Sequence, residues 1–204
     1  MERVLEWIDE GTTLCRGALR DLEGPSLLPD WSRRHVAAHL FLNADALGNL
    51  VEWARTGVER PMYPSAEARN ADIEQAALLP AEQLRSSFDD ACARLNAAMA
   101  TLTDEQWQAT IRNSRGASIP ATTIPWLRTR EVMIHAVDLD AGITFADLPA
   151  DFLDALCNDI RTTRDAVPEV DGPLPEQAAY LCGRPYKNLT DADGRPVEPL
   201  PPCL

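Results

Sequence analysis

The sequence predicts an all-α protein built as an up-and-down bundle of four long helices. Apolar residues recur at steps of three and four through most of the first 140 residues, which is the period of amphipathic helices. Glycine and proline mark the ends of these segments. The sequence contains no strand-rich block, no alternation of strands with helices and no internal repeat. A bundle is the simplest fold that buries four apolar stripes.

Each long helix is predicted from one apolar stripe and from the residues at its ends. The four helices cover about residues 4–22, 32–56, 80–102 and 125–141. Asp30 or Ser32 can cap the second helix, and Gly57 supplies its stop. Pro80 fits the first turn of the third helix, where a missing amide hydrogen costs nothing.

Shorter segments connect the helices of the bundle. Residues 60–65 are predicted to form an irregular connection, followed by a short helix that ends near Leu79. Residues 110–125 are predicted to form a long loop, in which Ile119 and residues 121–124 could extend as a strand.

The C-terminal part of the sequence differs in composition from the bundle. One helix is predicted from Pro149 to Val167 and a short one near Glu176–Cys182, with proline-rich irregular chain around them. We therefore expect a helical bundle over residues 1–148 and a short, mostly irregular segment over residues 149–204.

Composition and charge exclude several classes of protein. The 204 residues are 45% hydrophobic and 25% charged, with a mean hydropathy of −0.24, as in folded globular domains. The net charge of −13 and the absence of any cluster of four basic residues argue against nucleic-acid and membrane partners. No apolar run reaches 18 residues, and the acidic N-terminus is unlike a secretory signal. We expect a cytoplasmic protein.

The cysteines predict no structural cross-link. The five cysteines are scattered and contain no Cys-x-x-Cys pair, which argues against a disulfide framework and a zinc ribbon. We expect reduced thiols.

A carboxylate and an imidazole on the fourth predicted helix indicate a buried polar site. Glu131 and His135 are four residues apart, so their side chains project from one face about one turn from each other. The middle of this helix is apolar nearly all round, and such groups are costly there unless they are paired or bind a metal. A buried hydrogen-bonded pair without a metal is the alternative interpretation.

A third metal ligand could come from the second helix. His39 lies on the inward stripe of that helix, and two imidazoles with one carboxylate leave a coordination position for water or substrate, as in catalytic sites. His35 competes for this role because it is four residues away, but it lies in the first turn beside two arginines. We prefer His39 as ligand and expect His35 at a pocket rim or the surface. Asp138 could orient a ligand, although capping and solvating the helix end is the preferred interpretation.

Several segments together carry a family resemblance. They are Leu28–Leu40 with Asn43–Leu47, Ile119–Ala121 with Pro125–Trp126, Arg130–Leu139, Ala179–Arg184 and Pro199–Pro202. Their content and order resemble the mycothiol-dependent maleylpyruvate isomerase family, which is related to the DinB-like metal-binding bundles. The resemblance covers most of the chain.

This resemblance implies a four-helix bundle that holds a divalent metal, usually zinc, on His39, Glu131 and His135. It also implies that Arg184, in a Gly-Arg pair near the end, meets an anionic substrate as a catalytic residue. The family commonly carries a small α/β domain after the bundle, whereas the chain after Ala150 is short and has little strand pattern. We therefore expect a reduced version of that second domain.

The implied activity is a zinc- and mycothiol-dependent cis-trans isomerisation. A dication lowers the pKa of a bound thiol, and the resulting thiolate would add to the cis double bond of maleylpyruvate. Rotation in the enolate and elimination of the thiol would then give the trans acid. Besides Arg184, the side chains of Arg115 and Arg130 are cationic anchors to consider for a diacid, although solvated or structural roles suit both better.

Two alternatives keep the same fold. The thiolate could attack an electrophile and stay attached, which would make the protein a mycothiol S-transferase. The bundle could instead bind a metal and a small molecule without catalysis. In each case we expect a small-molecule partner and a monomer or homodimer.

Overall fold

The computed structural model describes residues 1–164 and 167–203, and it confirms the predicted all-α class. Contacts divide the chain into two compact units, Met1–Ala141 and Gly142–Leu204. In the described part of the chain, no helix is both long enough and apolar enough to cross a membrane.

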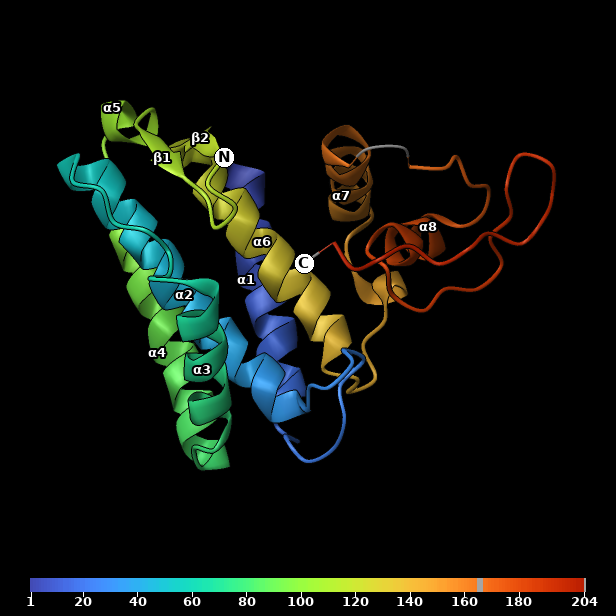
Figure 1. Ribbon diagram of the computed structural model, residues 1–204, viewed down its shortest axis with the longest axis horizontal. Coiled ribbons are helices and arrows are strands. Elements are labelled where there is room, and N and C mark those ends of the chain that lie inside the picture. Colours follow the sequence, from blue (N-terminus) through green and yellow to red (C-terminus); the bar gives the residue numbers. More distant parts are fainter. Residues whose placement is uncertain (165–166, 204) are drawn as a thin grey trace. The chain divides into compact units, whose positions relative to one another are not determined.

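Four long helices form the first unit (Figure 1). They are α1 (Glu2–Ala18), α2 (Arg33–Thr56), α4 (Ala81–Met99) and α6 (Ile124–Asp138). Helix α1 packs along α6, and α2 packs along both α4 and α6. Their apolar stripes meet in one core, in which Leu47, Phe88 and Ile134 are fully buried.

Helices α2 and α4 run in the same direction, because α3 (Ala66–Ala77) carries the chain back between them (Figure 1). Near the start of α2, Arg34 Nε donates to the carbonyl of Ala77, at the end of α3. Near its other end, the carbonyl of Arg55 accepts from Gln106 Nε2, beyond the end of α4. The connection from α2 to α3 therefore runs back along the bundle. The predicted up-and-down order is wrong at this point, because successive long helices α2 and α4 do not alternate in direction.

The ends of α2 are as the sequence predicts. Ser32 occupies the N-cap in a reciprocal capping box with His35, and Gly57 ends the helix in the left-handed conformation with φ 72°. Helix α1, however, ends at Ala18 rather than near Leu22. Leu19 and Leu22 remain buried beyond the helix, which is why the apolar stripe continued past its true end.

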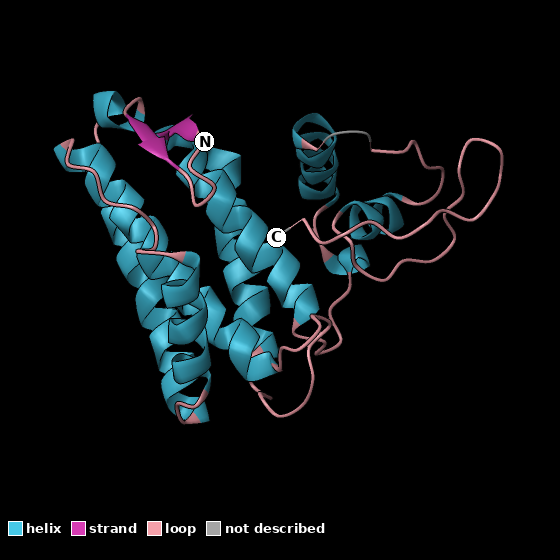
Figure 2. Cartoon of the chain, in the orientation of Figure 1, coloured by secondary structure: helices cyan, strands magenta, loops and turns pink. Residues whose placement is uncertain are grey.

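The predicted loop between α4 and α6 is more ordered than expected. A short helix α5 (Asp104–Trp107), which the sequence pattern missed, precedes a hairpin of β1 (Thr110–Arg112) and β2 (Ser118–Pro120), drawn in magenta in Figure 2. The expected strand is correct at Ile119 and wrong at residues 121–124. There the chain forms the 3₁₀ turn η1 (Ala121–Thr123) and enters α6, because Pro125 favours a first helical turn.

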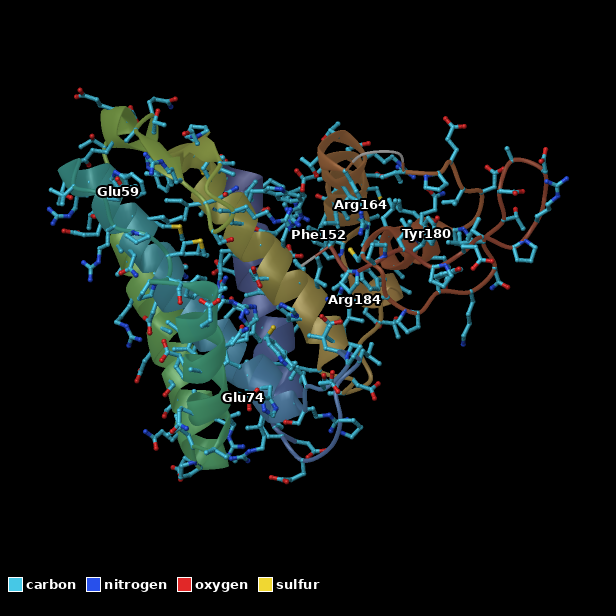
Figure 3. All side chains as sticks on the ribbon, viewed as in Figure 1. Glu59, Glu74, Phe152, Arg164, Tyr180 and Arg184 are labelled. Atoms are coloured by element: carbon cyan, nitrogen blue, oxygen red, sulfur yellow. The ribbon has the colours of Figure 1, made fainter. Side chains whose placement is uncertain are left out.

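The second unit contains the 3₁₀ turn η2 (Phe145–Asp147) and helices α7 (Ala150–Thr163) and α8 (Leu174–Leu181). The two helices pack on each other, and Phe152 of α7 and Tyr180 of α8 are fully buried (Figure 3). Helix α7 is shorter than the predicted 149–167, because Arg164 is already extended; residues 165 and 166 lie outside the described residues.

Candidate metal centre

Helices α2 and α6 bring three predicted ligands to one place in the first unit. His39 comes from the first half of α2, and Glu131 and His135 occupy successive turns of α6. Helix α1 backs α6 closely at this level, since a Cβ added to Gly11 would lie 2.6 Å from Val132 Cγ2. A side chain at position 11 would therefore displace the helix segment that carries Glu131.

The three side chains converge on a single carboxylate oxygen. Glu131 Oε2 lies 2.8 Å from His39 Nε2 and 3.2 Å from His135 Nε2. One donor atom from each residue lies within 4.8 Å of the other two. The imidazole rings meet edge to face at 87°. Two nitrogens and one oxygen thus surround one point, which is the donor set of an open zinc-type site.

Burial differs among the three residues. His39 and His135 are each 3% exposed, whereas the Glu131 side chain keeps 17% of its surface accessible. Glu131 is therefore the least buried of the three side chains.

The protein environment sets opposite pKa shifts on the two imidazoles. Burial lowers the pKa of His39 and outweighs the attraction of Glu131. Burial also opposes charge on His135, but hydrogen bonds with Asp138 and Glu131 raise its pKa to about 9. For Glu131 the same desolvation is outweighed by the two imidazoles, which hold its pKa well below the usual range. In the metal-free protein, a proton on His135 thus faces an ionised Glu131.

Asp138 corrects a prediction made from the sequence. Its carboxylate Oδ2 lies 2.8 Å from His135 Nδ1, and the residue is fully buried. The expected solvated helix end is therefore wrong. This contact fixes the orientation of the imidazole and leaves Nε2 facing Glu131, as carboxylates do beside metal-bound histidines.

His35 lies outside this group. Its Nδ1 takes part in the N-terminal capping box, 2.7 Å from Ser32 Oγ, and its Nε2 lies 3.3 Å from Glu74 of α3. Trp31 packs beside His35 and His39, with its ring centroid 5.6 Å from that of His39.

Arg69 of α3 is a neighbour of the site that the sequence analysis missed. Its Nη2 lies 3.3 Å from His39 Nδ1, and its guanidinium covers the ring of Tyr63 at 5.7 Å. The short helix that carries Arg69 was predicted, but its weak amphipathic pattern gave no sign of which face meets α2.

Of the predicted cationic anchors, Arg130 lies on α6 directly before Glu131 and is half-buried. The other two lie in other parts of the chain. Arg184 belongs to the second unit, where it is 4% exposed and Nη1 donates to the carbonyl of Cys182 at 2.7 Å (Figure 3). Its neighbour Gly183 has φ 68° and lies against the backbone of Pro201. Arg115 is exposed in the turn between β1 and β2. The catalytic role of Arg184 stays a prediction.

Comparison with known proteins decides the family. Residues 5–140 match the mycothiol maleylpyruvate isomerase N-terminal domain. The chain belongs to the mycothiol-dependent maleylpyruvate isomerase family. The matched region contains all three residues of the candidate metal centre. Comparison with curated protein sequences gave no significant match.

Solved structures of this family are similar over nearly the whole chain. A crystal structure of a mycothiol-dependent maleylpyruvate isomerase is 33% identical, with a TM-score of 0.90, and the alignment covers 98% of this chain and 95% of that one. A histidine-to-alanine mutant of such an enzyme is 32% identical, with the same TM-score and coverage. The similarity therefore extends into the C-terminal unit.

Proposed function

We propose that the protein is a zinc- and mycothiol-dependent cis-trans isomerase of the maleylpyruvate type. The observation that carries the proposal is the convergence of His39, Glu131 and His135 within 4.8 Å between two buried helices. The similar solved enzymes are isomerases of this kind, which favours isomerisation over thiol transfer.

The donor set suits a divalent cation. Two imidazole nitrogens and one carboxylate oxygen are ligands that zinc accepts, and three protein ligands leave a fourth position open. A zinc ion held there would lower the pKa of a bound thiol, so that the thiolate forms near neutral pH. Asp138 supports this arrangement because it holds Nδ1 of His135 and directs Nε2 toward the shared point.

The charge of the site favours an anionic nucleophile and an acidic substrate. Two neutral imidazoles and one carboxylate compensate only one of the two charges of a dication, so the metal with its three ligands would keep a net positive charge. The buried imidazoles also exclude water from the inner side of the site.

The nucleophile is assigned to the external thiol. Cys15, which lies behind α6, donates its thiol to the carbonyl of Val132, and burial raises its pKa to about 12. It is therefore protonated at neutral pH. Arg184 is assigned to the anionic end of the substrate on the basis of the family pattern, since a guanidinium binds carboxylates in bidentate geometry.

The test combines metal analysis with product analysis. Purified protein should contain one equivalent of zinc and should convert maleylpyruvate to its trans isomer, observed by proton NMR, only when mycothiol is added. Mass spectrometry separates isomerisation, which leaves the mass of the product unchanged, from S-transfer, which adds the mass of the thiol. Protein that holds no stoichiometric divalent metal after loading would refute the proposal.

A matched pair of variants tests the role of Arg184. Arg184→Ala should raise KM for the acid and leave zinc content unchanged, whereas Arg184→Lys should recover part of the loss because it keeps the charge. Equal KM values for the wild type and Arg184→Ala would remove this residue from the proposal.

A further inference from the structure

A pocket lined by both polar and apolar side chains lies beside the candidate metal centre, within the first unit. It lies between α2, the connection from α2 to α3, and α3 itself, and has a volume of about 230 Å³. Its lining includes Asp45, Asn49, Met62, Tyr63, Arg69 and Asp72. The volume is below the roughly 300–1,000 Å³ of pockets that hold whole drug-sized ligands, so this pocket suits one part of a larger molecule.

The inner end of the pocket touches the metal centre. Arg69 lines the pocket and places Nη2 3.3 Å from His39 Nδ1. Tyr63 lies under this guanidinium, and burial raises the pKa of its phenol, so that it stays a neutral hydroxyl. Arg69 therefore connects the pocket directly to one of the metal ligands.

The pocket wall is held in place without a ligand. Asn49 Nδ2 lies 3.4 Å from the carbonyl oxygens of both Pro61 and Met62, which ties the returning connection to α2. Such a preformed wall reduces the ordering cost of binding.

The lining carries one cationic and two anionic side chains. Arg69 brings one positive charge, and Asp45 and Asp72 lie exposed at the edge. The carboxylate of Asp45 is already bound by Arg94, at 2.8 Å. A dianionic acid would meet Asp72 with the same sign of charge, whereas a neutral polyol can donate hydroxyl hydrogens to a carboxylate and accept from Arg69.

We propose that this pocket binds the uncharged, hydroxyl-rich part of the thiol cosubstrate. The inference rests on the proposed function, because it assigns the thiol to the adjacent metal. Mycothiol carries its cysteine on an amino sugar joined to a cyclitol, so one end is a thiol and the other is a neutral polyol. The polyol occupies the pocket and contacts Asp72 and the Tyr63 hydroxyl, while Arg69 lies at the junction with the metal centre.

The test compares two thiols on the metal-loaded protein. Mycothiol contains the polyol, whereas N-acetylcysteinamide has the same thiol and amide groups without it. Isothermal titration calorimetry on Asp72→Ala and on Tyr63→Phe should show about five- to tenfold weaker mycothiol binding, the effect of one lost hydrogen bond. Binding of N-acetylcysteinamide should stay unchanged. Glu74→Ala is the matched control, because it removes an exposed carboxylate from the same helix outside the pocket (Figure 3).

Cobalt-substituted protein separates failure of this inference from failure of the proposed function. A thiolate-to-cobalt absorption band with either thiol reports that sulfur reaches the metal. If both thiols give the band but Asp72→Ala and Tyr63→Phe bind mycothiol as tightly as the wild type, the pocket proposal is wrong and the proposed function stands. The same conclusion follows if the two variants weaken both thiols equally. If neither thiol gives the band, the proposed function and the pocket proposal both fall.

Discussion

Two buried polar clusters lie about one turn apart on α6, and they differ in how their hydrogen-bonding groups are matched. In the first, Arg128 is 1% exposed and donates from Nη1 to the carbonyl of Leu40 at 2.8 Å and to Asn43 Oδ1 at 3.0 Å. Its Nη2 donates to Cys92 Sγ at 3.2 Å. In the second, two imidazoles face one carboxylate oxygen of Glu131.

This difference separates a cluster that supports the fold, around Arg128, from a cluster that can bind a metal, around Glu131. The guanidinium is a pure donor, and in the Arg128 cluster it meets three acceptors from the protein itself. At the metal centre, three atoms that can each offer a lone pair converge, and only protons or a cation can hold them together. A buried polar group therefore indicates chemistry when its acceptors outnumber its donors, and burial alone does not.

The largest effect is expected from removing a ligand of the metal centre. His39→Ala should lower zinc affinity by more than about 100-fold, beyond the loss typical of a residue that only supports a ligand. The measurement is zinc content by elemental analysis, with circular dichroism to verify the fold. His35→Ala is the control and should keep its zinc. If the His39→Ala protein still binds one zinc tightly, His39 is not a metal ligand, and the proposed difference between the two clusters is wrong.

In the metal-free protein, the pH dependence of the free energy of unfolding should come from the metal centre and not from the Arg128 cluster. The pKa of His135 is raised from 6.5 to about 9, so the stability from its proton is complete below pH 6.5 and is lost as the pH rises toward 9. We expect a decrease of about 2–3 kcal/mol in the free energy of unfolding over this range. Urea denaturation at several pH values measures it. His135→Gln should remove this dependence of the free energy of unfolding on pH. If the variant keeps the same dependence, His135 is not the group responsible.

Arg128→Met should lower stability without changing zinc binding, the opposite of the result expected for His39→Ala. The substitution leaves the carbonyl of Leu40 and the amide oxygen of Asn43 without a donor, and should lower the free energy of unfolding by about 2 kcal/mol. Zinc stoichiometry should not change, since the three ligands keep their contacts. Urea denaturation and zinc analysis on one preparation check both statements. Loss of zinc at full stability would show that the clusters are not independent.

Asp138→Asn tests the smallest expected effect. Asparagine keeps an oxygen that can accept from His135 Nδ1 but removes the negative charge, and zinc affinity should fall about tenfold. Competition with a chelator of known affinity provides the measurement, and Asp140→Asn, two residues further along in the chain, provides the control. If both variants hold zinc equally, Asp138 serves only the helix end.

The sequence could predict what depends on short-range periodicity. The stripes located the bundle helices, and the spacing of Glu131 and His135 placed both on one face of α6. His39 was preferred because it lies on an inward stripe. Each inference needed only the helical repeat, which determines the side of a helix from which each side chain projects.

Contacts between elements could not be predicted in the same way. Asp138 is three residues from His135, a spacing compatible with either a buried contact or a solvated helix end. The partners of Arg128 and the pocket beside Arg69 depend on how α2, α3 and α4 pack, and no local pattern encodes that packing.

The parallel course of α2 and α4 obliges the chain between them to travel back along the bundle. This detour passes the metal ligands without belonging to the four-helix core. Residues 57–72 can thus vary while the residues that hold the helices together stay as they are. Directed evolution toward a different thiol should begin with libraries in this segment and leave α1, α4 and α6 untouched.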